Sequence, residues 1–120
     1  MEIIGGEGLE NAKLVLVQNE TRAFTVEHRD EEGHVVDHSQ STAKMAVVNT
    51  KTDEFYDLSP CCTCAESVIY VDIPASTTAQ IPIGKKYEWD IMVEASNGKV
   101  TRLVYGPAEV CDSYAFDGVE

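Results

Sequence analysis

A hairpin signal in the last third of the chain constrains the fold more than any other feature. Between residues 84 and 110, apolar residues alternate with polar ones up to Asn97-Gly98, and a second apolar run follows. Asn and Gly both tolerate the positive φ of a type I′ turn, so this pair predicts a tight connection between two strands. A lone hairpin is only marginally stable in water, so more strands must surround it. We expect its core residues to be Tyr87, Trp89, Ile91 and Leu103.

Turn signals divide the rest of the chain into short apolar segments. Residues 60–66 read as a break that could hold a helical turn at 62–67. About seven strands at such spacings are typical of a sandwich or a small barrel. The sequence therefore predicts an all-β, single-domain antiparallel β-sandwich of immunoglobulin-like type with extended terminal arms. Besides the hairpin, the expected strands are residues 13–17, 23–29, 43–50, 55–58 and 67–73, with a short piece at 34–36.

The chain of 120 residues is long enough to bury a core as one domain without metal or disulfide support. We expect an N-terminal arm at residues 1–10, the sandwich at 11–111 and a C-terminal tail at 112–120. Both ends are acidic, and each carries a short apolar element. Ile3 and Ile4 in the arm, and Tyr114 and Phe116 in the tail, are the expected contacts with other subunits.

The net charge of −12 excludes most nucleic-acid partners, because Lys and Arg must neutralise phosphates there. It also disfavours anionic membrane surfaces. A solvated acidic surface explains the charge, with steering toward a basic partner as the alternative. No apolar run approaches the length of a membrane span, and the acidic first residues do not resemble a signal peptide. We therefore expect a protein made in a cytosol or in a particle assembled there.

Three clustered cysteines and one distant cysteine are the candidates for metal chemistry. Cys61 and Cys64 have the CxxC spacing of a zinc site, and Cys111 would have to join them together with a histidine. The second ligand pair of a structural zinc site is missing. Free thiols in a reducing cytosol, or a disulfide from Cys111 to the cluster that includes Cys62, remain alternatives. A redox dithiol lacks its usual βαβ context. We expect neither a metal nor a cofactor.

No catalytic constellation can be assembled from the remaining residues. His28, His34 and His38 lie within eleven residues, and a hairpin could bring His28 and His34 together, but the HExxH motif is absent. The sequence also lacks a GxSxG elbow and a phosphate-binding loop. Its paired carboxylates fall in expected turns. We expect a protein that is not an enzyme.

The last part of the chain contains a distinctive succession of residues: Ile73-Pro74-Ala75-Ser76-Thr77, then Gly84, Tyr87, Trp89, Asp90 and Ile91, then Ser96, Gly98, Val100, Arg102 and Leu103, and last Tyr105, Gly106 and Val110. With these residues, the end of the chain resembles a domain that recurs in bacteriophage virion proteins. It is most similar to the small β-sandwich proteins of actinobacteria-infecting phages, which are described as minor tail or tail-fibre-associated proteins. The resemblance implies a sandwich fold and virion membership, and it transfers no catalytic residue.

This resemblance implies a structural protein of the virion, in the tail, tail fibre or baseplate, that is assembled in the bacterial host cytoplasm. Its partners would be other phage tail or head subunits, bound in many copies or as a homo-oligomer through strand edges and arms. A head decoration protein is the alternative in the same class. A carbohydrate-binding module that stacks sugars on Trp89 or Tyr70 is the alternative in another class.

Overall fold

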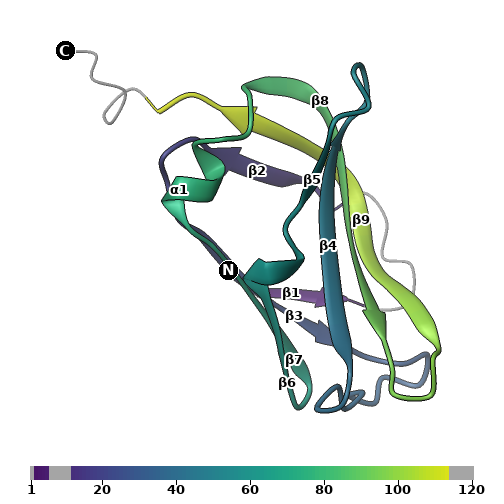
Figure 1. Cartoon of the computed structure of the whole chain (residues 1–120). Coiled ribbons are helices and arrows are strands. Elements are labelled where there is room, and N and C mark those ends of the chain that lie inside the picture. Colours follow the sequence, from purple (N-terminus) through teal and green to yellow (C-terminus); the bar gives the residue numbers. More distant parts are fainter. Residues whose placement is uncertain (1, 6–11, 114–120) are drawn as a thin grey trace.

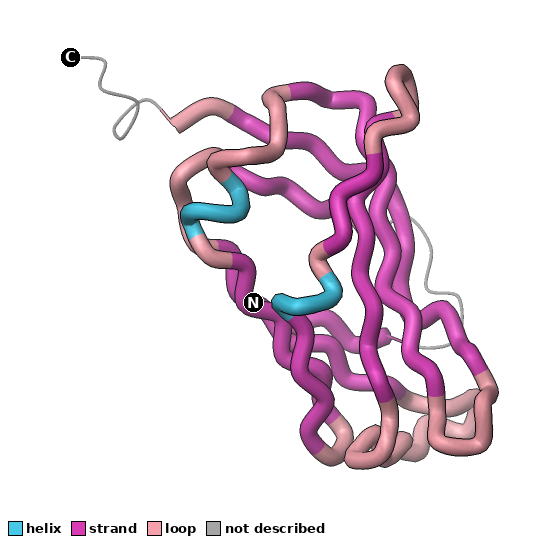
Figure 2. Tube along the Cα trace, viewed as in Figure 1, coloured by secondary structure: helices cyan, strands magenta, loops and turns pink. Residues whose placement is uncertain are grey.

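The computed structural model of the chain describes residues 2–5 and 12–113, and it consists of two β-sheets packed face to face (Figure 1). Strands dominate the trace, with two short helical segments between them (Figure 2). The predicted all-β, single-domain sandwich is confirmed. The elements are β1 (Glu2–Gly5), β2 (Leu14–Val17), β3 (Arg22–His28), β4 (Thr42–Asn49), β5 (Phe55–Asp57), η1 (Ser59–Cys61), β6 (Cys62–Ala65), β7 (Val68–Ile73), α1 (Ala75–Thr78), β8 (Gly84–Glu94) and β9 (Val100–Cys111).

The strand order is that of an immunoglobulin-like domain. The four-stranded sheet has the order β1-β3-β7-β6, and the five-stranded sheet has the order β2-β9-β8-β4-β5. If β1 and β2 are counted as one first strand divided between the sheets, the orders become A-B-E-D and A-G-F-C, with β5 beside C. This division places the beginning of the chain at an edge of each sheet.

The first strand of each sheet runs parallel to its neighbour, which the expectation of an antiparallel sandwich did not include. β1 pairs with β3 so that Ile3 lies opposite Val26 and Ile4 opposite Glu27. β2 pairs in the same sense with β9. The other strand pairs in the described part of the chain are antiparallel. Four residues of the expected N-terminal arm therefore extend the chain's own sheet, where they pair the exposed edge of β3.

The core lies between the inner faces of the two sheets. Tyr87, Trp89, Ile91 and Leu103 are all buried. The ring of Phe24 on β3 meets the ring of Trp89 on β8 edge-on, with 6.1 Å between the centroids. β3 and β8 correspond to the two strands that a disulfide joins in antibody domains. Here an aromatic contact connects the sheets between these strands.

Two local expectations were wrong. Residues 62–65 form the strand β6, not a helical turn, because Cys62 and Cys64 alternate with exposed Thr63 and pair with the β-branched strand β7. The helical turn comes earlier, in η1, where Pro60 sits in the first turn. Residues 34–36 contribute a single bridge, between Arg29 and Val35. No helix in the described residues has the length and apolar character needed to cross a membrane.

The β8–β9 hairpin is present, but its turn is not the predicted type I′. Gly98 has a φ of +89°, whereas Asn97 is not among the residues with positive φ. The amide of Gly98 donates to the carbonyl of Ala95, and the amide of Ala95 donates to the carbonyl of Lys99. This is the pattern of a three-residue loop closed by a left-handed glycine. The Asn97 carboxamide oxygen accepts the Lys99 amide at 2.9 Å, which stabilises the loop without a positive φ.

We expect Gly98→Val to destabilise the fold by about 1–2 kcal/mol, because a β-branched residue is strained in the left-handed region. Nothing lies within 4 Å of the added Cβ, so the cost comes from the backbone angle and not from a clash. Urea unfolding measures it. Ser96→Val in the same loop is the matched control and should change stability by less than about 0.5 kcal/mol. Equal effects of the two changes would contradict this account of the turn.

Candidate functional site

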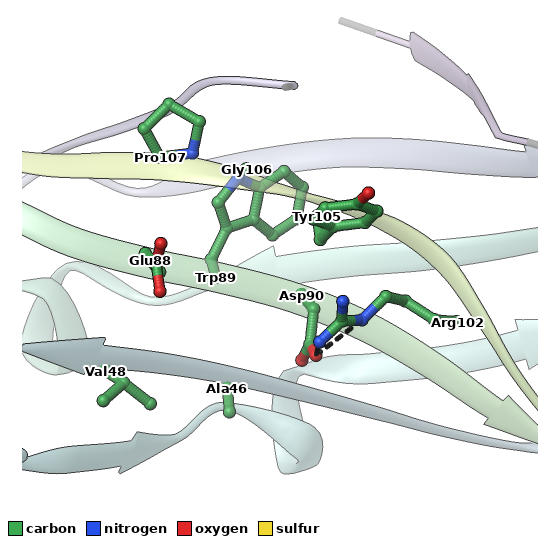
Figure 3. A pocket seen from close by; sticks show the side chains of 9 residues that line it. All are labelled: Ala46, Val48, Glu88, Trp89, Asp90, Arg102, Tyr105, Gly106 and Pro107. Carbon is green, nitrogen blue, oxygen red and sulfur yellow. Dashed lines mark hydrogen bonds and ion pairs between the residues drawn. The ribbon is translucent and has the colours of Figure 1, made fainter. Parts of the chain in front are cut away.

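The outer face of the five-stranded sheet contains a hollow of about 610 Å³ over β4, β8 and β9 (Figure 3). Its floor and walls come from two rows of side chains that point away from the core. Residues directly opposite each other on paired strands share a face of the sheet, so the register defines these rows. The first row joins Ala46, Asp90 and Tyr105, and the second joins Val48, Glu88 and Pro107.

A β-bulge in β9 places Arg102 beside the first row. The register with β8 shifts between Ile91 and Met92, so that Ile91 lies opposite Val104 and Met92 lies opposite Arg102. Leu103 is the extra residue, and both Leu103 and Val104 are buried. Because a bulge changes which face the following residues occupy, Arg102 and Tyr105 lie on the same outer face although they are three positions apart.

Arg102 connects the charged and aromatic parts of the hollow. Its Nη2 and Nε atoms lie 3.1 and 3.2 Å from Oδ2 of Asp90. Its guanidinium carbon lies 4.6 Å from the centroid of the Tyr105 ring, a cation–π geometry. Figure 3 shows the guanidinium directed at the Asp90 carboxylate, beside Tyr105. These contacts fix the orientation of a long side chain that would otherwise be mobile in solvent.

The other side of the hollow combines the apolar side chains of Val48 and Pro107 with the carboxylate of Glu88, and it continues to the sheet edge. Val48 lies opposite Phe55 of β5, and Phe55 is 63% exposed. Pro107 is the residue of the second row that belongs to β9, and it lies one residue before the stretch that pairs with β2. A proline is tolerated there because β2 does not pair with β9 at this position. Small Ala46 leaves the space between these apolar groups and the Arg102–Asp90 pair.

The residue types that line the hollow resemble those found at the centres of protein–protein interfaces. The groups that line the hollow include no nucleophile paired with a base. Tyr and Arg, which provide its two oriented side chains, are enriched at the centres of protein–protein interfaces. The exposed Arg102–Asp90 pair by itself contributes little to stability, about 0.2–1 kcal/mol. The pair instead holds the Arg102 side chain in one orientation at the surface.

The four cysteines do not come together in one cluster. Cys61, Cys62 and Cys64 lie at or in β6, Cys111 ends β9 in the other sheet, and all four are free. Burial raises the pKa of the Cys62 thiol to about 12, and it also raises the pKa of the Cys61, Cys64 and Cys111 thiols. These thiols are thus protonated near neutral pH. Within the described residues, no three His, Cys, Asp or Glu side chains could hold a metal ion together.

The histidines pair differently from the expectation. His28 contacts His38, and both are buried. The His34 side chain is 73% exposed and lies near the carboxylates of Asp30 and Glu32 instead. The reason is that residues 30–34 form a tight turn around the Asp30 carboxylate, which accepts the amides of Glu32 and His34. This turn carries His34 away from His28.

The residues expected to contact ligands or subunits occupy varied places. Trp89 is 3% exposed, so its ring offers no surface on which a sugar could stack. Tyr70 of β7 is exposed on the other sheet. Ile3 and Ile4 fall within β1, while Tyr114 and Phe116 lie outside the described residues.

Sequence reasoning missed the hollow. Asp90, Arg102 and Tyr105 entered the sequence analysis only as residues of the resemblance, with no role of their own. One signal was available: Leu103-Val104 breaks the alternation of apolar and polar residues in β9. Such a break in an otherwise alternating strand indicates a bulge, and bulges often occur next to functional surfaces.

The sequence matches no protein-family model and no curated protein. Among solved structures, the chain is similar to the N-terminal domain of phage TP901-1 ORF48. The fold is similar to that of a phage protein domain. The TM-score is 0.57 at 8% sequence identity, and the match covers 92% of this chain and 98% of that chain. At this identity the likeness concerns the fold, and it extends over nearly the whole of both chains.

Proposed function

We propose that this chain is a structural protein of a bacteriophage virion, in the tail, tail fibre or baseplate, and that it acts by protein–protein contacts. The observation that carries the proposal is the fold match to a phage protein domain over 92% of this chain. The motif resemblance to virion proteins of actinobacterial phages supports the same class. The other phage structural proteins, or further copies of this chain, would be its partners in the particle.

The hollow on the five-stranded sheet is the proposed contact surface. Phe55 and Val48 provide apolar area at one side, and Tyr105 and Arg102 provide oriented contacts at the other. Interface anchors combine such groups with a cavity that a partner side chain can fill. The high negative charge of the chain favours a partner with a basic patch, which also accelerates association.

Mass spectrometry of purified particles tests the location. Particles of the phage that encodes the chain are dissociated, and heads and tails are separated before digestion. We expect peptides of this chain in the tail fraction. Peptides only in the head fraction would indicate a decoration protein instead. Absence from both fractions would contradict a virion role.

Filling the hollow tests the contact surface. We expect Ala46→Arg to leave the fold intact, because this side chain points away from the core, and to reduce incorporation into particles at least about tenfold. Thr63→Arg is the matched control, since it adds the same residue at an exposed position of the other sheet. Incorporation is measured by quantitative mass spectrometry of particles, and circular dichroism checks the fold. Normal incorporation of Ala46→Arg would exclude the hollow as the contact.

A further inference from the structure

Two histidines form a buried, stacked pair at one end of the sandwich. His28 ends β3, and His38 belongs to the connection from β3 to β4. They are only 6% and 3% exposed. Their rings are nearly parallel, at 14°, with centroids 5.0 Å apart. Nδ1 of His28 lies 2.7 Å from Nε2 of His38, so one proton is shared in a hydrogen bond between two imidazoles.

The pair holds the connection between β3 and β4 against the sandwich. Nδ1 of His38 lies 2.9 Å from the Ser41 hydroxyl, and the Ser41 amide donates to the carbonyl of His38. The His38 amide donates to the carbonyl of Glu66, and the Val36 amide donates to the carbonyl of His28. The imidazole contact and the Ser41 hydroxyl therefore add side-chain hydrogen bonds to the backbone hydrogen bonds that position residues 35–41.

A small cavity lies beside the two rings. Its volume is about 160 Å³, and the β8–β9 hairpin contributes its far wall through Val93, Ala95, Lys99 and Thr101. The connection carrying His38 thus closes the end of the core over this hairpin. Release of the connection would expose the buried side chain of Val93, which lines this cavity.

The geometry limits how many protons the folded pair can take. A neutral imidazole has one donor and one acceptor nitrogen, and an imidazolium has two donors. With one added proton, the pair can still share a hydrogen bond. With two added protons, two N–H groups would face each other across 2.7 Å in a buried site. The folded pair therefore accepts at most one proton, whereas the two free side chains of the unfolded chain accept two.

Some of the charged groups around the pair favour its protonation and others disfavour it. Burial lowers the pKa of His38, its neighbour His28 lowers it further, and Asp37 raises it by a smaller amount. Asp30 on the same connection and Lys99 on the hairpin also line the cavity. The Asp30 carboxylate favours protonation and the Lys99 ammonium disfavours it. The net effect is a lowered pKa of His38, so this ring of the pair resists protonation while the chain is folded.

We propose that the His28–His38 pair is a proton-operated latch, which holds the β3–β4 connection in place at neutral pH and releases it in acid. An unfolded histidine takes up a proton near pH 6.5. Because the folded pair binds fewer protons than the unfolded chain below that pH, stability falls as the pH falls. For each proton that the unfolded chain binds and the folded pair does not, the unfolding equilibrium constant rises about tenfold per pH unit below about 6.5. The latch is independent of the proposed virion contact.

Urea unfolding at pH 7 and pH 5 tests the latch. The comparison is between the natural chain and the double variant His28→Gln, His38→Gln, whose amide side chains form hydrogen bonds but take up no proton. We expect the unfolding constant of the natural chain to rise at least about tenfold more between these two pH values. His34→Gln is the matched control, because it removes an exposed imidazole from the same connection. It should keep the natural pH profile.

A second measurement on the natural chain needs no variant. We expect NMR of the imidazole nitrogens to show that one ring of the pair stays neutral at pH 5 in the folded protein. We also expect the amides of His38 and Ser41 to lose hydrogen-exchange protection relative to those of β8, after correction for the intrinsic effect of pH. Protonation of both rings with this protection unchanged would overturn the latch. So would equal pH profiles of the natural chain and the double variant.

Discussion

Trp89→Ala is expected to destabilise the protein by about 3–5 kcal/mol, the cost of truncating a fully buried aromatic side chain. The indole is 3% exposed and packs edge-on against Phe24 of the opposite sheet. Its Nε1 also donates to the carbonyl of Ala12 at 2.7 Å, which fixes the chain just before β2. The substitution therefore leaves a cavity between the sheets and removes the partner of a carbonyl group.

Urea unfolding followed by circular dichroism measures this loss, because Trp89 is the only tryptophan and its fluorescence disappears with it. Trp89→Phe separates the two contributions, since it keeps an aromatic ring in the core and loses only the hydrogen bond and part of the volume. We expect it to cost clearly less than Trp89→Ala. Tyr70→Ala, at a ring that is 51% exposed, is the control. A loss below about 1 kcal/mol for Trp89→Ala would show that the indole is not part of the core.

Gly106→Val is expected to cost about 3 kcal/mol, at the upper end of the usual range for overpacking. A Cβ at this position would lie 2.3 Å from the backbone oxygen of Ala12 and 2.7 Å from its nitrogen. Backbone atoms cannot rotate away as a flexible side chain could. The amide of Ala12 also donates to the carbonyl of Tyr105, so separating the two segments breaks a hydrogen bond as well.

The same unfolding experiment measures this cost, and here the emission of Trp89 adds a local readout. We expect it to shift to longer wavelength in the folded variant, because displacement of Ala12 removes the indole's hydrogen-bond partner and admits water. Val100→Ala, at an exposed position of the same strand, should change stability by less than about 0.5 kcal/mol. If Gly106→Val left the free energy of unfolding unchanged, the start of β2 would not approach β9 this closely.

The sequence pattern was sufficient to predict the core residues of a strand that has one buried face and one exposed face. Tyr87, Trp89, Ile91 and Val93 alternate with polar residues, and a period of two places them on one face of any strand. The position of the β8–β9 hairpin followed from Asn97-Gly98 in the same way. The turn type did not, because a loop with one left-handed glycine and a loop with two positive φ residues accept the same dipeptide.

The candidate site was harder to predict, because it depends on register between distant segments. Arg102 meets Asp90 and Tyr105 only because Leu103 is accommodated as an extra residue opposite β8. His28 meets His38, and not His34, because a turn around the Asp30 carboxylate directs His34 outward. In both cases the contact depends on a local irregularity, a β-bulge or a turn, that the alternation of apolar and polar residues does not predict.

The sequence by itself determined that this protein is a β-sandwich with a hairpin near its end, because alternation and turn residues act over a few neighbouring positions. Only the tertiary structure decided that β1 and β2 join the sheets in parallel, that a hollow lies over β4, β8 and β9, and that two histidines share a proton. These features arise where segments far apart in the chain meet, and the balance of burial and hydrogen bonding across all of them selects one register.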